Sequence, residues 1–257
     1  MSKRKIGVMI ESFRLGVKGG IKKAAQLGAD GFQIYVIEGE MLASNMNAAA
    51  RRDFRRFVAD EGLVISALCA DFGHGFLDEA RNRDLVGKTQ DAMDQAADLG
   101  TAVVTSHIGK LPQDEKDPQW LAARRAVTEI ARHGEKIGVA FASETGPESP
   151  EHLLKFLKQI PYSAAKVNYD PANFCMFGFD QIAGVKVLKD YIVHTHAKDG
   201  LRNQLLEVPL GEGGVDFPRY IRELDAIGYD GFLTIEREVG PDPVKDITMA
   251  MEFLRGL

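Results

Sequence analysis

Four short segments of the sequence each place an acid or an imidazole directly after an apolar or β-branched run. They are ASETG (142–146), VNYDPAN (167–173), HTHAKD (194–199) and FLTIERE (232–238), with Glu144, Asp170, His196 and Glu236 as the candidate groups. Three carboxylates and one imidazole suit a hard or borderline divalent cation rather than a soft, thiol-seeking ion. The groups are 26, 26 and 40 residues apart. Because a strand-plus-helix unit of a (β/α)8 barrel takes about 30 residues, this spacing predicts one ligand from each of several consecutive strands.

A single acid at the end of a strand has a simpler explanation, as the cap of the next helix or as a solvated loop charge. That explanation weakens when such groups follow successive strands and two of them lie within apolar runs, because unpaired buried charges are costly. We therefore interpret the four groups as one metal site. The majority of oxygen ligands favours Mn²⁺, with Mg²⁺, Co²⁺ and Zn²⁺ as alternatives.

The strands that would position these groups are visible as apolar runs that alternate with amphipathic stretches of helix length. This alternation is typical of a parallel sheet with crossover helices. We predict strands at 5–10, 31–36, 63–70, 102–107, 139–144, 165–170, 191–196 and 231–236. Helices are predicted to end at Gly28, Gly100, Gly138 and Gly228, because glycine adopts the left-handed conformation of a C-terminal cap without strain.

The chain has 257 residues, 45% of them hydrophobic, and no Pro/Ser-rich linker divides it. The predicted fold class is therefore α/β, a (β/α)8 TIM barrel in a single domain covering residues 1–257. In such a barrel the carboxyl ends of the strands, with the loops that follow them, form the active-site face. Glu144, Asp170, His196 and Glu236 are predicted to lie on that face.

Composition limits the cellular setting and the partners. The net charge is −5 and the pI is about 5.7, which gives no indication of a nucleic-acid partner. Two cysteines, Cys69 and Cys175, form neither a disulfide framework nor a zinc ligand set. No apolar run reaches the roughly 20 residues of a membrane helix, and the N-terminal apolar stretch is too short for a signal sequence. We expect a cytoplasmic protein without a membrane partner.

The segments SETG, DPAN, HAKD and GYDGFLTIE, together with LGEGGVDF at 210–217, resemble those of the xylose isomerase-like barrel superfamily. That group includes ketose 3-epimerases, inosose isomerases and dehydratases, and abasic-site endonucleases. The resemblance covers the whole chain. It implies a divalent ion held by the residues matching Glu144, Asp170, His196 and Glu236. It also implies a small carbohydrate or polyol substrate and a homo-oligomer, a dimer or tetramer.

In the epimerases of this group the first and last ligands also serve as acid and base, which points to Glu144 and Glu236. A metal bound to a carbonyl and an adjacent hydroxyl acidifies the intervening C–H bond by stabilising the enediolate. One carboxylate takes the proton, and a second carboxylate on the opposite face inverts the centre; return to the neighbouring carbon gives an isomer instead. Loss of a leaving group from the β carbon would make the enzyme a lyase or dehydratase, and this alternative stays open.

Further residues are predicted to bind substrate. His107, at the end of the fourth strand, and Asn173, three residues after Asp170, match positions where the family places substrate-facing groups. Lys198 is predicted either to bind a substrate oxygen or to orient a carboxylate, with a solvated lysine at the strand end as the alternative. Arg202 matches only roughly an arginine that some family epimerases use.

Three other functions receive less support from the sequence. A phosphate site in LGEGGVDF would suit the region of strands 7 and 8, but the loop contains no Lys or Arg and Asp216 is predicted to cap a helix. An unphosphorylated sugar or inositol derivative is therefore favoured.

An abasic-site endonuclease would need a histidine where Asn173 stands, and a basic surface. A noncatalytic binding barrel would have to retain four aligned ligands without chemistry.

Overall fold

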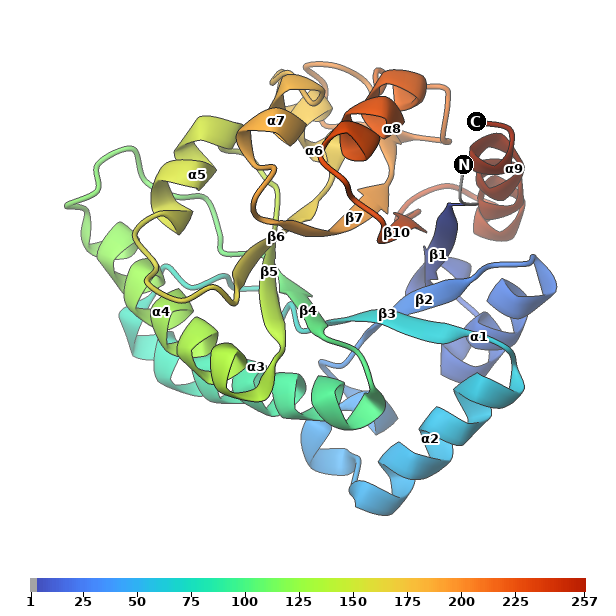
Figure 1. Ribbon diagram of the computed structural model, residues 1–257, viewed down its shortest axis with the longest axis horizontal. Helices are drawn as coiled ribbons and strands as arrows, with labels where there is room; N and C mark the ends of the chain where they lie inside the picture. The colour runs from blue at the N-terminus through green and yellow to red at the C-terminus, as the bar shows by residue number, and fades with distance from the viewer. Residues whose placement is uncertain (1–3) are drawn as a thin grey trace.

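The computed structural model describes residues 4–257, in which eight parallel strands close into one barrel (Figure 1). The strands are β1 (Lys5–Met9), β2 (Gly31–Tyr35), β3 (Val64–Cys69), β4 (Val103–Ser106), β5 (Ala140–Glu144), β6 (Ala165–Tyr169), β7 (Ile192–Ala197) and β10 (Phe232–Ile235). They pair in the order β1-β10-β7-β6-β5-β4-β3-β2, so that the last barrel strand lies beside the first. The predicted (β/α)8 barrel is confirmed.

Helices form the outer layer around this barrel (Figure 1). They are α1 (Gly16–Gln26), α2 (Ala48–Asp60), α3 (Glu79–Leu99), α4 (Pro118–Ile137), α5 (Pro150–Leu157), α6 (Pro171–Met176), α7 (Ala183–Val187), α8 (Phe217–Ala226) and α9 (Pro243–Arg255). Short 3₁₀ turns η1 (Ile10–Phe13), η2 (Gly39–Met41) and η3 (Ala43–Asn45) follow β1 and β2. A small antiparallel pair, β8 (Asp199–Gly200) and β9 (Glu207–Val208), lies in the connection after β7. Within residues 4–257, no helix has both the length and the apolar character needed to cross a membrane.

The ends of the predicted strands fall within one residue of the observed ends. The runs were readable because barrel strands are covered on both faces and are therefore almost continuously buried. The predicted helix caps are also left-handed. Gly28, Gly100, Gly138 and Gly228 have φ of 76°, 85°, 74° and 76°. At each of these glycines the chain turns from the end of a helix into the next barrel strand.

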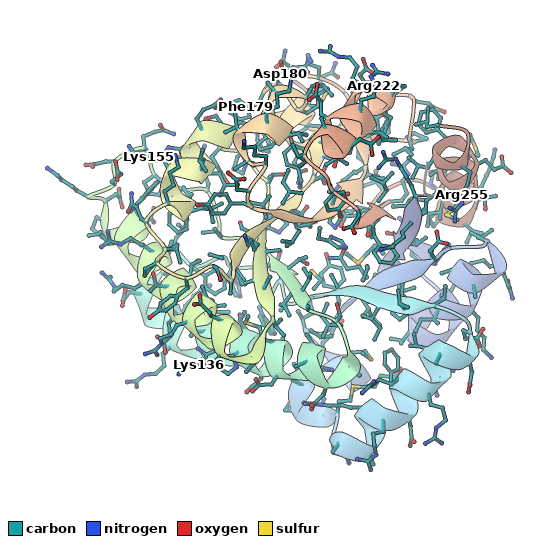
Figure 2. The ribbon with its side chains drawn as sticks, viewed as in Figure 1. Lys136, Lys155, Phe179, Asp180, Arg222 and Arg255 are labelled. Atoms are coloured by element: carbon teal, nitrogen blue, oxygen red, sulfur yellow. The ribbon has the colours of Figure 1, made fainter. Side chains whose placement is uncertain are left out.

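At the amino-terminal end of the barrel, an ion pair and backbone hydrogen bonds join the last helix to the start of the first strand. Arg255, labelled on α9 in Figure 2, donates to the backbone oxygen of Arg4 at 3.0 Å and to Asp30 Oδ2 at 2.7 Å. The same Asp30 oxygen accepts the N–H of Ile6 at 2.9 Å. The last helix therefore holds the first strand at the end of the barrel opposite the predicted site.

The barrel interior is polar near its centre, where branched apolar side chains are usual. Gln33, Thr105, Asn168, His194 and Thr234 are all at most 1% exposed. They bond to one another: Gln33 Nε2 donates to Thr105 Oγ1 at 2.8 Å, His194 Nδ1 lies 2.8 Å from Asn168 Oδ1, and Thr234 Oγ1 lies 3.1 Å from His194 Nε2. Buried polar groups persist when they are paired in this way. These hydrogen-bonded side chains form a buried polar layer inside the barrel, below the carboxyl ends of the strands.

Close packing between α4 and the barrel can be tested at Gly134. A Cβ there would lie 2.3 Å from the Val139 carbonyl oxygen and 2.5 Å from Met93 Cε. Although alanine is the better helix former, we expect Gly134→Ala to lower the free energy of unfolding in urea by about 1–3 kcal/mol. Gly87→Ala in α3 is the control: apart from its chain neighbours and the backbone of its own helix, no described atom lies within 4 Å of an added Cβ. This substitution should raise that free energy by up to about 1 kcal/mol. Equal effects of the two substitutions would contradict this packing.

Candidate metal centre

The four predicted ligands lie together at the carboxyl ends of β5, β6, β7 and β10. One ligand atom from each of Glu144, Asp170, His196 and Glu236 lies within 4.8 Å of the other three. His196 Nδ1 is 3.3 Å from Glu236 Oε2, 3.5 Å from Glu144 Oε1 and 3.7 Å from Asp170 Oδ2. All four side chains are buried. The barrel therefore gathers groups that are widely separated in the sequence into one candidate metal centre.

The chemistry of this cluster fits a cation. Asp170 Oδ2 and His196 Nδ1 are fully buried, yet neither makes a hydrogen bond to any residue from 4 to 257. Buried polar atoms nearly always have a partner, and a cation between these atoms would be one. Burial opposes charge on His196, but the carboxylates of Glu236 and Glu144 raise its pKa well above the usual range. The same negative field favours a divalent cation at the centre.

Asp170 serves both the fold and the cluster. Its Oδ1 accepts the N–H groups of Ala172 at 2.7 Å and Asn173 at 3.1 Å, which caps α6, and Oδ2 is left facing the other ligands. The Thr145 hydroxyl accepts the Asp170 N–H at 2.8 Å and donates to its carbonyl oxygen at 2.9 Å. The simpler helix-cap explanation is thus correct for one oxygen of Asp170, and the other oxygen remains available as a ligand.

His196 is oriented from across the barrel by Gln33, a residue of β2 that the sequence reasoning missed. Gln33 Oε1 lies 2.9 Å from His196 Nε2 and can accept its proton, which orients the ring with Nδ1 toward the cluster. Asn168 contributes a second contact: its Nδ2 lies 3.1 Å from His196 Nε2 and also 3.4 Å from Glu144 Oε2. A signal was present for both residues: Gln33 interrupts an apolar strand, and Asn168 precedes Asp170 by two positions and so shares its face.

Lys198 lies against one carboxylate of the cluster. Its Nζ donates to Glu236 Oε2 at 2.9 Å and also contacts Glu238, and the side chain is only 4% exposed. Burial opposes the ammonium charge, but the surrounding carboxylates, Glu236 foremost, raise the pKa of Lys198 well above its usual range. Of the two predicted roles for Lys198, this geometry fits orientation of a carboxylate.

His107 lies beside the cluster and contacts Asp71, a carboxylate that the sequence reasoning also missed. Its Nδ1 is 2.6 Å from Asp71 Oδ2, and its Nε2 is 3.7 Å from Glu144 Oε1. Asp71 is held in turn by the N–H of Gly73 at 2.9 Å. The charge of Glu144 raises the pKa of His107 to about 9, with burial opposing and Asp71 adding to the shift. His107 is half-buried, so part of its side chain is accessible to solvent.

The other two predicted substrate residues differ in position. Asn173 Nδ2 donates to Glu144 Oε1 at 3.1 Å, so Asn173 adjoins the cluster. Arg202 points elsewhere: its guanidinium donates to the Phe179 carbonyl oxygen at 3.1 Å and to Gln181 Oε1 at 2.6 Å. Figure 2 shows Phe179 near the outer edge of the molecule. The structure therefore brings Asn173 to the site and directs Arg202 toward the α6–α7 connection.

Glu148, in the loop after β5, is another buried carboxyl group that the sequence reasoning missed. It is 6% exposed, and its Oε2 has no hydrogen-bond partner among the described residues. Burial raises the pKa of Glu148 to about 7, with a backbone hydrogen bond and the charge of His107 opposing the shift. The folded state therefore binds this proton more tightly than the unfolded chain does.

The consequence is a pH-dependent stability that Glu148→Gln should remove. Ionising the buried Glu148 lowers the free energy of unfolding. This cost is absent below pH 4.5, the pKa of the group in the unfolded chain, and complete above about pH 7, its pKa in the folded protein. We expect Glu148→Gln to raise the free energy of urea unfolding at pH 8 by an amount on the order of 1–3 kcal/mol, and to leave it nearly unchanged at pH 4.5. Glu151→Gln, at an exposed position of α5, controls for the change of charge. A gain for Glu148→Gln of the same size at both pH values would contradict the shifted pKa.

Comparison with known proteins places the chain in a family. The sequence profile described as the xylose isomerase-like TIM barrel matches residues 21–257. The chain belongs to this family. An uncharacterized protein of Methanocaldococcus jannaschii is 25% identical over 250 residues, which cover 91% of this chain and 83% of the relative. The putative L-ribulose-5-phosphate 3-epimerase SgbU of Escherichia coli is 25% identical over 258 residues, covering 90% and 87%.

Solved structures agree with the family fold. The crystal structure of a xylose isomerase domain protein from Planctomyces limnophilus superposes with a TM-score of 0.84 at 24% identity, covering 99% of this chain and 95% of that one. At this level of identity the likeness establishes the barrel and its closure. The family resemblance predicted from the SETG, DPAN, HAKD and GYDGFLTIE segments is confirmed.

Proposed function

We propose that this protein is a divalent-metal-dependent isomerase or epimerase that moves a proton on the carbon next to a carbonyl of a small polyhydroxy compound. The observation that carries the proposal is the buried cluster of four ligand atoms within 4.8 Å of one another, two of which lack any described partner. The similarity to SgbU, a putative 3-epimerase, supports the same reaction class. Mn²⁺ is the proposed ion because oxygen ligands form the majority.

A divalent ion held by Glu144, Asp170, His196 and Glu236 would act as a Lewis acid and make the neighbouring C–H bond acidic. The proton itself would be moved by the chain. Glu144 and Glu236 come from β5 and β10, and β6 and β7 lie between those strands in the barrel, so the two carboxylates approach the centre from different sides. We propose that one removes the proton and the other delivers a proton to the opposite face, which inverts the centre.

The neighbours of the two glutamates suggest how each is supported. Glu236 is held by Lys198 at 2.9 Å, a contact that would fix its orientation. Glu144 adjoins the half-buried His107, which offers a route for proton exchange with solvent. His107 and Asn173 are also the proposed contacts for substrate oxygens. Arg202 is given no substrate contact in this proposal, because its guanidinium is already engaged at the α6–α7 connection.

The test is α-proton exchange in D₂O. The Mn²⁺-loaded protein is incubated with ketoses, inososes and keto-sugars, and deuterium is located by NMR. Deuterium on the carbon next to the carbonyl, together with an epimer or isomer, is the expected result. Exchange accompanied by loss of water or an aglycone would replace the isomerase by the lyase alternative, which shares the first proton abstraction. Absence of exchange across the panel would contradict the proposal.

A further inference from the structure

Glu207 is a buried carboxylate that joins the connection after β7 to the loop after β10. It lies in β9, just before the glycine-rich loop (210–214) that leads to α8. Its side chain is only 6% exposed. Its Oε1 accepts Arg237 Nη1 at 2.6 Å, and each of its oxygens lies 3.2 Å from the backbone nitrogen of Glu238, which donates to it. The antiparallel β8–β9 pair is thereby held against the segment that follows β10.

Arg237 connects this contact to the candidate metal centre, because it follows Glu236 directly in the chain. Its side chain is buried between two carboxylates: Nε donates to Asp246 Oδ2 of α9 at 2.8 Å, and Nη1 donates to Glu207. Its backbone N–H donates to Ser12 Oγ at 3.0 Å. A guanidinium is a rigid planar group, so two carboxylates on different edges fix both its position and its orientation. The backbone next to Glu236 is therefore fixed as well.

Lys198 forms a second link between Glu207 and Glu236. Its Nζ is 2.9 Å from Glu236 Oε2 and 3.9 Å from Glu207 Oε2, and it also contacts Glu238. The same Oε2 atom of Glu236 lies 3.3 Å from His196 Nδ1, within the cluster. Every carboxylate near an ammonium attracts it, so the position of Lys198 depends on all of them. Without the charge of Glu207, Lys198 would move closer to Glu236 and compete more strongly with a cation for Oε2.

We infer that Glu207 is a positioning residue, which sets the place of Glu236 as a metal ligand and as a proton-transfer group. It acts through Arg237 and Lys198. This inference rests on the proposed function, because it concerns what Glu236 does in that site. Side chains that hold a metal ligand in place commonly change metal affinity or activity by about 10- to 100-fold when they are replaced.

The first arm of the test measures Mn²⁺ affinity without turnover. Glu207→Gln keeps the size of the side chain and removes its charge. We expect it to raise the Kd for Mn²⁺, followed by the electron paramagnetic resonance signal of the free ion, by about 10- to 100-fold. A Kd equal to that of wild type would overturn the inference.

Asp30→Asn is the matched control for this measurement. Asp30 also accepts an arginine and a backbone N–H, at 2.7 and 2.9 Å, but it does so at the amino-terminal end of the barrel. Both substitutions remove an ion pair and should lower the Tm. Only Glu207→Gln should change the Kd for Mn²⁺. An equal rise of the Kd in Asp30→Asn would show that lost stability is the cause, and would overturn the inference.

Arg237→Lys provides a second variant, which decides the question if Glu207→Gln does not fold. Lysine keeps the positive charge but lacks the planar fork that reaches Glu207 and Asp246 together. It should also raise the Kd for Mn²⁺. Combined with Glu207→Gln, its effect should be less than additive, because both substitutions break the same ion pair. An unchanged Kd in Arg237→Lys, or fully additive effects, would overturn the inference.

The second arm uses α-proton exchange in D₂O at saturating Mn²⁺. Because Glu207 acts through Glu236 and not on the substrate, Glu207→Gln should lower kcat by about 10-fold or more and leave KM nearly unchanged. A rise in KM with kcat unchanged would place the effect on substrate binding and overturn the inference. Asp30→Asn should retain the kcat and KM of wild type.

The two arms separate failure of this inference from failure of the proposed function. If wild type binds Mn²⁺ but no compound exchanges its α proton, the proposed function fails, and the Kd of Glu207→Gln still decides the inference. If Glu207→Gln binds Mn²⁺ and exchanges the α proton as wild type does, only the inference fails. Absence of Mn²⁺ binding to wild type would refute both.

Discussion

Replacing either Glu144 or Glu236 by glutamine should lower the rate of α-proton transfer by about 10²–10⁴-fold while the barrel remains folded. Glutamine keeps the size of the side chain and one ligand oxygen, but it cannot accept or return the proton. The measurement is deuterium exchange by NMR on metal-loaded protein, with folding checked by circular dichroism and metal content measured in each variant. Glu212→Gln is the control, since Glu212 is an exposed glutamate in the glycine-rich loop. Exchange at the wild-type rate in Glu144→Gln or Glu236→Gln would refute the proposed pair.

The same two variants can also assign the faces of the substrate. In an epimerase with one carboxylate on each face, each epimer loses its proton to a different glutamate. The exchange rate is measured separately for each epimer in each variant that retains metal. The larger decrease is expected for the epimer whose proton lies on the side of the replaced glutamate. Slowing of both epimers in only one of the two variants would indicate that a single glutamate handles both proton transfers, as in an isomerase.

Removal of the metal should abolish turnover and lower the Tm, and Mn²⁺ should restore both. An ion that binds only the folded protein stabilises it by about 2.7 kcal/mol at a free concentration 100 times its Kd. The Tm rise with Mn²⁺ should be lost in Asp170→Asn, because the Oδ2 atom that faces the cluster is replaced or neutralised. The readout is differential scanning calorimetry with chelator, Mn²⁺, Mg²⁺, Co²⁺ or Zn²⁺. A wild-type Tm insensitive to chelator and to all four ions would remove the metal from the proposal.

Asp78→Asn is the matched control for Asp170→Asn. Asp78 caps α3 by accepting the N–H of Ala80 at 3.0 Å, as Asp170 caps α6 by accepting that of Ala172 at 2.7 Å. Both substitutions disturb a helix cap, for which a cost of about 1 kcal/mol is typical. Only Asp170 also faces the cluster. Loss of the Mn²⁺-dependent rise in Asp170→Asn alone would therefore separate metal binding from helix capping.

The sequence by itself was sufficient for the barrel and for the clustering of the four candidate ligands, because both depend on local signals. Apolar runs marked the strands, and glycine at Gly28, Gly100, Gly138 and Gly228 marked the helix ends through the left-handed conformation it adopts without strain. Once the barrel is recognised, convergence of the ligands needs no further information. All parallel strands end on one face, so residues at successive strand ends such as Glu144 and Asp170 must become neighbours.

Only the tertiary structure decided how these side chains are supported. The contact between Gln33 and His196 joins positions 163 residues apart, and the contact between Asp71 and His107 joins two different strand ends. Such pairs depend on the curvature of the closed barrel and on rotamers, which no local pattern specifies. The same is true of Asp199. Its position after His196 was visible in the sequence, but its burial among four N–H groups follows from how the later loop folds back over β8.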